Sequence, residues 1–283
     1  MEKNINTPFV KYATGVTVDN IDTITHFDLT GASYHGGTTL SSGALPKWDL
    51  LNNAYMIKRC GFRQHDGAFL TDAANEELVY RFCRELSIAC AEYRTVEVRY
   101  FDEDLKIHIE CPATLTKIFK GLVHLRDIRD LMDLGKANDL IIELADNFQI
   151  NPQLNDQIFI DYIFDQSDRH TKNIGFVEKT LSPLFDSGHS LYFDVFDSEL
   201  SPSYYDRVAK HKTFGKHLDE LLRFALKYIH NGFSFDYDEN NLVDKFHSVL
   251  KEMQHYYSNE RYVFIENLVT RRIRNVGQIL AEA

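Results

Sequence analysis

The fold and the chemistry of this chain are decided by two short stretches, Asp165-Gln166-Ser167-Asp168-Arg169-His170-Thr171-Lys172-Asn173-Ile174-Gly175-Phe176 and Pro183-Leu184-Phe185-Asp186-Ser187-Gly188. Asp168 stands five residues before Asn173. On a loop that leaves a helix, this spacing lets the carboxylate meet a substrate hydroxyl while the amide oxygen turns towards a metal ion. Asp186 then adds a second carboxylate after a short apolar run. The order predicts a phosphoryl-transfer centre in which Asn173 and Asp186 hold Mg²⁺.

A structural role is the alternative for these residues, because Asp and Asn in loops often only satisfy backbone groups in a turn. Two further features favour the functional interpretation. Apolar segments flank the first loop at residues 158–164 and 174–177, and the second loop carries its aspartate directly after Phe185. The combination of spacing and flanks is more specific than either loop alone.

The two loops together resemble the catalytic and metal-binding loops of HipA-like serine/threonine kinases, and more distantly those of phosphoinositide kinases. The resemblance implies that Asp168 is the catalytic aspartate, that Asn173 and Asp186 bind metal, and that ATP and Mg²⁺ are the cofactors. Arg169 departs from the small residue of HipA itself and is closer to the lipid-kinase pattern.

A loop rich in small residues follows a predicted strand at residues 24–29 and ends at Lys47. Glycines let backbone N–H groups approach an anion, and Lys47 adds positive charge. The stretch Ser42-Gly43-Ala44-Leu45-Pro46-Lys47 is similar to the phosphate loop of HipA-like kinases, which makes Gly43 and Lys47 candidate ATP contacts. Because these kinases autophosphorylate a serine at this place, Ser41 and Ser42 are candidate modification sites. A mere mobile loop of small polar residues is the alternative.

Lys58 lies in the second strand of a predicted hairpin, with strands at residues 48–51 and 54–59 around a turn at Asn52 and Asn53. A strand lysine usually only extends its charged head into solvent. The sequence Tyr-Met-Ile-Lys, however, is similar to the strand that carries the ATP-binding lysine in the family. Glu76, in the first turn of a helix predicted over residues 71–88, is the candidate partner of Lys58 by the same resemblance.

Two further positions follow from the resemblance or from local chemistry. Residues 95–101 and 105–111 predict a second hairpin, and by position Glu110 and Cys111 resemble the hinge that binds adenine through its backbone. His170 is a second candidate in the catalytic loop. We favour a structural role for it, bonding local backbone carbonyls, over proton transfer, because Asp168 already occupies the position of the base.

The composition is that of a folded protein without a broad basic surface. The chain has 283 residues, 44% hydrophobic and 26% charged, and a formal net charge of −11. The negative charge argues against a main task in gripping nucleic acid or an anionic membrane. The four cysteines lack metal-site spacing and no apolar segment is long enough for a signal core or a membrane span, so we expect reduced thiols and a cytoplasmic location, with secretion without a cleaved signal left open.

The expected fold class is α+β: a bilobed protein-kinase-like fold with a small mixed α/β N-lobe at residues 1–110 and a mainly helical C-lobe at residues 111–283, with ATP and Mg²⁺ between them. Helical periodicity predicts most of the second lobe, and a strand is expected beyond Asp186. The basic cluster at residues 271–274 is interpreted as a solvated helix face. The predicted helices cover residues 116–134, 138–148, 155–164, 214–230, 239–257 and 259–283, and the strand covers residues 190–196.

The resemblance implies transfer of the γ-phosphate of ATP to a serine or threonine of an unidentified protein. It also implies a toxin kinase whose partner is an antitoxin. The sequence before the phosphate loop is too short for the extra N-terminal subdomain of full-length members, so that piece would be a separate small protein, or the antitoxin contact differs. The alternatives are a lipid or small-molecule kinase, suggested by Arg169, and a pseudokinase that binds ATP without catalysis. Direct binding to nucleic acid or membrane is not expected.

Overall fold

The structure, a computed structural model, describes residues 8–33, 45–62, 68–103, 105–127, 150–178, 180–205, 216–229 and 232–282. It divides into two compact units. The first unit comprises Met1–Glu77 and Glu92–Ile118, and the second comprises Leu78–Ala91 and Phe119–Ala283. Ser41, Ser42 and Gly43 lie outside the described residues, as do the predicted helix 138–148 and residues 128–134 of the preceding one.

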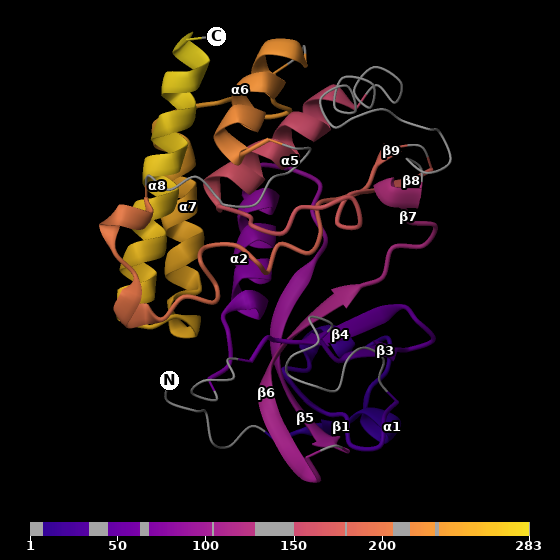
Figure 1. Ribbon diagram of the computed structural model, residues 1–283. Coiled ribbons are helices and arrows are strands. Elements are labelled where there is room, and N and C mark those ends of the chain that lie inside the picture. The colour runs from indigo at the N-terminus through magenta and orange to yellow at the C-terminus, as the bar shows by residue number, and fades with distance from the viewer. Residues whose placement is uncertain are drawn as a thin grey trace. The chain divides into compact units, whose positions relative to one another are not determined.

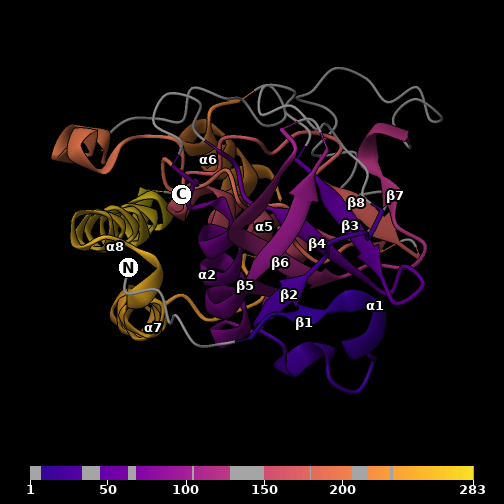
Figure 2. The ribbon, with the colours of Figure 1, turned by 90° about the horizontal axis from the view of Figure 1, so that it is seen from below.

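The described part of the first unit is built on one sheet of six strands in the order β1-β2-β5-β6-β4-β3. The strands β1, β2 and β5 pair in parallel, whereas β5-β6, β6-β4 and β4-β3 are antiparallel, and the neighbouring strands can be followed in Figure 2. Short helical turns, α1 and η1, accompany the first strands. The bounds are β1 Val10–Lys11, α1 Tyr12–Gly15, η1 Ile21–Thr23, β2 His26–Asp28, β3 Lys47–Leu50, β4 Tyr55–Arg59, β5 Tyr93–Asp102 and β6 Ile107–Lys117.

The predicted hairpin of β3 and β4 is confirmed, and its turn shows why the two asparagines are there. Leu51, Asn52 and Asn53 all have positive φ, at 51°, 56° and 61°. Asparagine tolerates this left-handed region better than most residues. Side chains then alternate along β4, with Tyr55, Ile57 and Arg59 buried and the residues between them partly exposed, which is the pattern of a strand with one core face.

Helix α2, Asp72–Glu85, contributes to both units, since the division falls between Glu77 and Leu78. Its start is fixed within the first unit, where both carboxylate oxygens of Asp72 accept the backbone N–H of Gly61 at 2.9 and 3.0 Å. Glu77 in turn accepts the backbone N–H of Thr95 in β5 at 2.7 Å. These bonds attach the first turns of α2 to the sheet.

The described part of the second unit is mainly helical. Helices α5, α6 and α8 pack together, α7 packs along α8, and Figure 1 shows these helices as one group. Three rings from different segments, Phe82, Phe164 and Phe246, meet edge to face at centroid distances of 5.8 to 6.0 Å. The bounds are β7 Val123–His124, α5 Asn151–Ile163, β8 Gly175–Val177, β9 Thr180–Leu181, η2 Asp197–Glu199, η3 Pro202–Tyr204, α6 Leu218–Tyr228, α7 Glu239–Glu252, η4 Gln254–Tyr256 and α8 Asn259–Glu282.

Three predictions about elements differ from the structure. The predicted boundary between residues 110 and 111 falls inside β6, whose pairing with β5 includes Glu110 and Cys111, and the change of unit comes after Ile118. The predicted helix over residues 116–134 is wrong at its start, because β6 continues to Lys117 and β7 follows at Val123–His124. Within residues 190–196, turns at residues 191–194 take the place of the predicted strand.

The physical reason for the last difference is a set of long-range bonds to the backbone. Leu191 and Tyr192 have positive φ, at 57° and 53°, which no strand allows. The guanidinium of Arg261 in α8 donates to the carbonyls of Tyr192 at 3.1 Å and Val195 at 2.5 Å. Carbonyl groups that a strand would place in a ladder are therefore directed at one buried cation. Among the described residues, none of the helices combines the length and the apolar character that crossing a membrane requires.

Candidate active site

Helix α5 delivers the catalytic stretch, as its apolar sequence predicts. Its residues from Leu154 to Ile163 are all buried. The helix ends where the backbone N–H of Phe164 bonds the carbonyl of Ile160 at 3.1 Å and Asp165 takes a positive φ of 51°. The chain then turns out of the helix and presents Asp168, whose side chain is half-exposed, with a relative exposure of 42%.

Gln166 connects the two predicted loops. Its side-chain oxygen accepts the backbone N–H of Asp168 at 3.1 Å. Its side-chain nitrogen donates to the backbone carbonyl of Asp186 at 3.0 Å. Asp186 has a positive φ of 56°, a conformation that is uncommon for a residue other than glycine and clusters at functional sites. One buried amide therefore fixes both aspartates by their backbones.

Asn173 is oriented by the catalytic loop itself. Its backbone N–H donates to the carbonyl of His170 at 2.8 Å, and its side-chain nitrogen donates to the carbonyl of Asp168 at 2.9 Å. With the amide nitrogen used in this way, the amide oxygen is the atom that can meet a cation. The structure thus brings Asp168 and Asn173 into direct contact, at the spacing that the sequence suggested.

Arg169 forms hydrogen bonds with both loops. It is buried, and its Nε and Nη2 donate to the carboxylate of Asp161 in α5 at 2.9 to 3.2 Å. Its Nη1 donates to the carbonyls of Asn173 at 2.9 Å and Phe185 at 2.5 Å. Nη2 also reaches Oγ of Ser187 at 3.2 Å. Burial raises the pKa of the Asp161 carboxyl and the guanidinium opposes this, since it stabilises the charged form.

Two histidines flank the carboxylate of Asp168. Nε2 of His170 lies 3.8 Å from one oxygen, and Nδ1 of His189 lies 3.4 Å from the other. His170 also accepts the backbone N–H of Lys172 through Nδ1 at 3.3 Å, a local backbone bond of the opposite direction to the predicted one with a carbonyl. His189 stacks on Phe193 at a centroid distance of 4.2 Å, and its carbonyl accepts both the backbone N–H and the hydroxyl of Ser167 at 3.0 and 2.8 Å.

The donor set fits a magnesium ion that is shared with a substrate. Mg²⁺ prefers oxygen ligands and is usually held by one or two protein groups together with phosphate oxygens. Asn173 offers an amide oxygen and Asp186 a carboxylate, and their backbones are tied to the same guanidinium through Asn173 itself and through Phe185. Within the ranges that the structure describes, no group of three or more His, Cys, Asp and Glu side chains is arranged to hold a metal ion.

The first unit contains the predicted pair of Lys58 and Glu76. The Nζ of Lys58 forms an ion pair with Oε1 of Glu76, which is completely buried in α2. Lys47 is the cross-strand partner of Lys58, so both lysine side chains leave the same face of the β3–β4 hairpin. Like charges directly opposite each other are unfavourable. Asp49, two residues after Lys47 in β3, lies on this face as well, so the two lysines stand beside the carboxylates of Glu76 and Asp49.

The remaining predicted contacts, Glu110 and Cys111, lie within β6. They pair with Arg99 and Val98 of β5. The carboxylate of Glu110 is 2.7 Å from the guanidinium of Arg99, and Cys111 is buried. The predicted hinge position thus does not coincide with the change of unit after Ile118.

The four cysteines are free thiols, and burial raises the pKa of the Cys60 thiol next to Cys111 well above its usual value.

Sequence reasoning missed the contacts that Arg169 and His189 make with the predicted site, and it misjudged the burial of Arg272 in α8. The sequence marks Arg169 only as a departure from a family pattern, and no motif indicates His189. Arg272 was interpreted as part of a solvated basic face, and this is wrong: it is buried, donates to Asp165 at 3.0 Å and lies 4.9 Å from the centre of the Tyr162 ring. The available signal was its position in the pattern, since Arg272 lies one turn after the buried Leu268 and four residues before the buried Val276.

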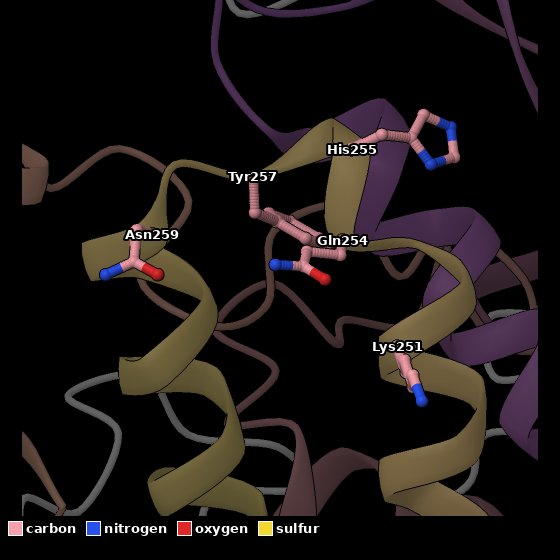
Figure 3. Close-up of a pocket in the computed structure, with 5 residues that line it drawn as sticks. All are labelled: Lys251, Gln254, His255, Tyr257 and Asn259. Carbon is pink, nitrogen blue, oxygen red and sulfur yellow. The ribbon is translucent and has the colours of Figure 1, made fainter.

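A pocket of about 500 Å³ lies elsewhere in the second unit, where α7 ends and α8 begins. Figure 3 shows its five lining residues, and the ring of His255 points away from the other four side chains. None of the residues predicted for phosphoryl transfer lines it. The lining residues are Lys251, Gln254, His255, Tyr257 and Asn259.

Comparison with known proteins supports the fold and leaves the family open. No protein-family model matches the chain. No curated protein matches it either. Among solved structures, the chain is similar to the crystal structure of a Helicobacter pylori proinflammatory kinase, CtkA, with a TM-score of 0.61 and 16% sequence identity over 90% of this chain and 96% of that chain. The chain therefore has the mixed α/β architecture of a kinase-like fold, with a sheet in the first unit and a mainly helical second unit.

Proposed function

We propose that this protein is an ATP- and Mg²⁺-dependent phosphotransferase of the HipA-like type that phosphorylates serine or threonine in a protein. The observation that carries the proposal is the joining of Asp168, Asn173 and the Asp186 loop by one buried glutamine and one buried arginine. A turn that only satisfied its own backbone would not need bonds to a second loop. The kinase-like fold supports the same conclusion.

In the proposed reaction, the carboxylate of Asp168 accepts the hydrogen bond of the acceptor hydroxyl and takes up its proton. The acceptor oxygen bonds to the γ-phosphorus of ATP, and the bond from that phosphorus to the bridging oxygen breaks, which releases ADP. Asn173 and Asp186 would hold Mg²⁺, which supplies charge neutralisation at the phosphates when bound. Lys58, oriented by Glu76, and Lys47 would meet phosphate oxygens.

The position of Arg169 does not favour the lipid-kinase alternative. Its guanidinium is buried and is directed at groups of the protein itself. The residue type at this position therefore bears on how the loops are held together and carries no information on the acceptor. A protein acceptor follows from the family resemblance and from the net charge of −11, which is unfavourable for an anionic lipid surface.

The experiment is incubation of the purified chain with γ-labelled ATP and Mg²⁺, with and without a cell extract, followed by identification of the labelled amino acid. The proposal expects label on serine or threonine of a protein. Label on lipid, or binding of ATP without any transfer in the presence of extract, would support the lipid-kinase or the pseudokinase alternative instead.

Autophosphorylation in the phosphate loop is a further part of the proposal. A phosphate on Ser41 or Ser42 adds about −1.5 to −2 charges to a loop expected to approach the triphosphate. The modified protein should then bind ATP poorly. Mass spectrometry of the protein after incubation with ATP and Mg²⁺, compared with the Asp168→Asn variant, should find phosphate at either serine only in the active protein. An antitoxin remains the proposed partner if the chain acts as a toxin kinase.

A further inference from the structure

We infer that Arg169 is a positioning residue that fixes the two proposed magnesium ligands relative to each other. This role rests on the proposed function. It differs from a contribution to folding alone, because it concerns how two separate loops share one group. Asn173 lies in the first loop and Asp186 in the second. Gln166 bonds the backbones of Asp168 and Asp186, whereas Arg169 bonds the backbone of Asn173 and the residues on both sides of Asp186.

The geometry of the contacts carries the inference. Nη1 of Arg169 donates to the carbonyl of Asn173 at 2.9 Å, so it holds the first ligand by that residue's own backbone. The same nitrogen donates to the carbonyl of Phe185 at 2.5 Å, directly before Asp186. Nη2 donates to Oγ of Ser187 at 3.2 Å, directly after it. The second ligand is therefore bracketed on both sides by one guanidinium.

The guanidinium is itself fixed in place by Asp161. Nε and Nη2 meet the two carboxylate oxygens of Asp161 at 2.9 to 3.2 Å, and both side chains are buried. Asp161 belongs to α5, which is buried along most of its length. Because Asp161 fixes the planar guanidinium to α5, the guanidinium holds the two loops in a fixed position relative to this helix.

Arginine is required at this position for a chemical reason. Its fork presents five N–H donors in fixed directions, and here they serve a carboxylate, two carbonyls and a hydroxyl at once. A lysine would retain the positive charge beside Asp161 but offers a single ammonium on a flexible stem. Replacing Arg169 by lysine therefore keeps the positive charge beside Asp161 and removes the directed hydrogen bonds to the two loops.

The test measures the Mg²⁺ concentration that half-saturates nucleotide binding, determined by calorimetry with ATP, together with the melting temperature. Arg169→Lys should raise this concentration roughly tenfold or more, because loss of groups that orient metal ligands typically costs 10- to 100-fold in metal affinity. The matched control is Arg272→Lys, the same substitution in a second buried pair with an aspartate, Asp165. It should lower the melting temperature and change the Mg²⁺ requirement less than about twofold, because it removes no bond to Asn173 or Phe185.

A milder pair of variants covers the case in which Arg169→Lys fails to fold. Ser187→Ala removes one acceptor of the guanidinium, and Ser182→Ala is its control, since both serines are buried and the hydroxyl of Ser182 bonds the carbonyl of Pro183 instead. Only Ser187→Ala should raise the Mg²⁺ requirement. Equal shifts within each pair, or no shift in Arg169→Lys and Ser187→Ala, would overturn the positioning role. A wild-type protein whose ATP binding ignores Mg²⁺ would overturn the proposed function as well.

Discussion

The two regions proposed to handle ATP are held in different ways. In the second unit, Asp168, Asn173 and the Asp186 loop share a buried network through Gln166 and Arg169. In the first unit, Lys58 forms an ion pair with the carboxylate of Glu76. From the roles proposed for these groups, we infer that Asp168, which this network holds, sets the rate of the chemical step, whereas the Lys58–Glu76 pair sets affinity for the nucleotide.

The largest effect is expected from Asp168→Asn. The substitution keeps the size of the side chain and the backbone bond from Asp168 to Gln166, but it removes the group that accepts the proton. Turnover should fall by on the order of 10²- to 10³-fold, with ATP affinity nearly unchanged. Phosphoryl-transfer assays and calorimetry check this, with Asp194→Asn as a control in the same unit. Near-normal turnover would refute the assignment.

Asp186→Asn should act on the metal and not on the proton. The positive φ of 56° is retained, since asparagine tolerates it as well as aspartate does. Because a neutral amide binds Mg²⁺ more weakly than a carboxylate, Mg²⁺-dependent ATP affinity should fall by roughly 10- to 100-fold. A Mg²⁺ titration of ATP binding measures the effect. If the Asp186→Asn variant binds ATP as tightly as the wild type at every Mg²⁺ concentration, Asp186 does not bind the ion.

Lys58 should affect ATP more than adenosine, because the lysine is proposed to meet phosphate. A hydrogen bond to a charged group contributes about 1.5–3 kcal/mol, so Lys58→Ala should lower ATP affinity by roughly tenfold or more. The single substitution also removes the ion pair that Lys58 makes with the buried Glu76 and should lower the melting temperature.

The double variant Lys58→Met with Glu76→Gln separates these two effects, because it removes the ion pair without leaving a buried charge. Its melting temperature should lie nearer to that of the wild type, while its affinity for ATP stays low. Calorimetry with ATP and with adenosine on both variants decides the matter. Equal losses for the two ligands would mean that Lys58 is structural.

The smallest effect is expected from His189. Its ring lies 3.4 Å from the Asp168 carboxylate and is supported by stacking on Phe193, but its pair with Asp168 is half-exposed. Half-exposed pairs contribute little, so His189→Gln should lower turnover only a few-fold. His170→Gln is the comparison, since His170 Nε2 lies farther from the carboxylate, at 3.8 Å. A larger loss for His170 than for His189 would reverse this ranking.

The parts of the fold that were predicted from sequence are those that depend on local signals. Residues that are close in the chain specify the Asn52-Asn53 turn, the buried helix α5 and the loop from Asp168 to Asn173. The contact of Lys58 with Glu76 was also predicted, although only through resemblance to a family. In each case, few other structures or contacts are compatible with the sequence pattern.

What the sequence did not reveal depends on buried charges with distant partners. Arg169 and Arg272 look like surface residues because arginine usually is one, and their burial is compensated by Asp161 and Asp165 at the two ends of a single turn. The turns within residues 190–196 have the same origin, since Arg261 bonds carbonyls of this segment from α8. Long-range compensation of this kind has no periodicity that a single sequence displays.

The most direct test of the comparison is the dependence of phosphoryl transfer on ATP concentration, measured for Asp168→Asn and for the double variant Lys58→Met with Glu76→Gln. The account predicts that the Asp168 variant stays slow at every ATP concentration, with a normal KM. The Lys58 variant should need more ATP but recover most of the wild-type rate at saturation. Two results would contradict these separate roles of Asp168 and Lys58. One is recovery of the Asp168 variant's rate at high ATP, and the other is a Lys58 variant that stays equally slow at saturating ATP.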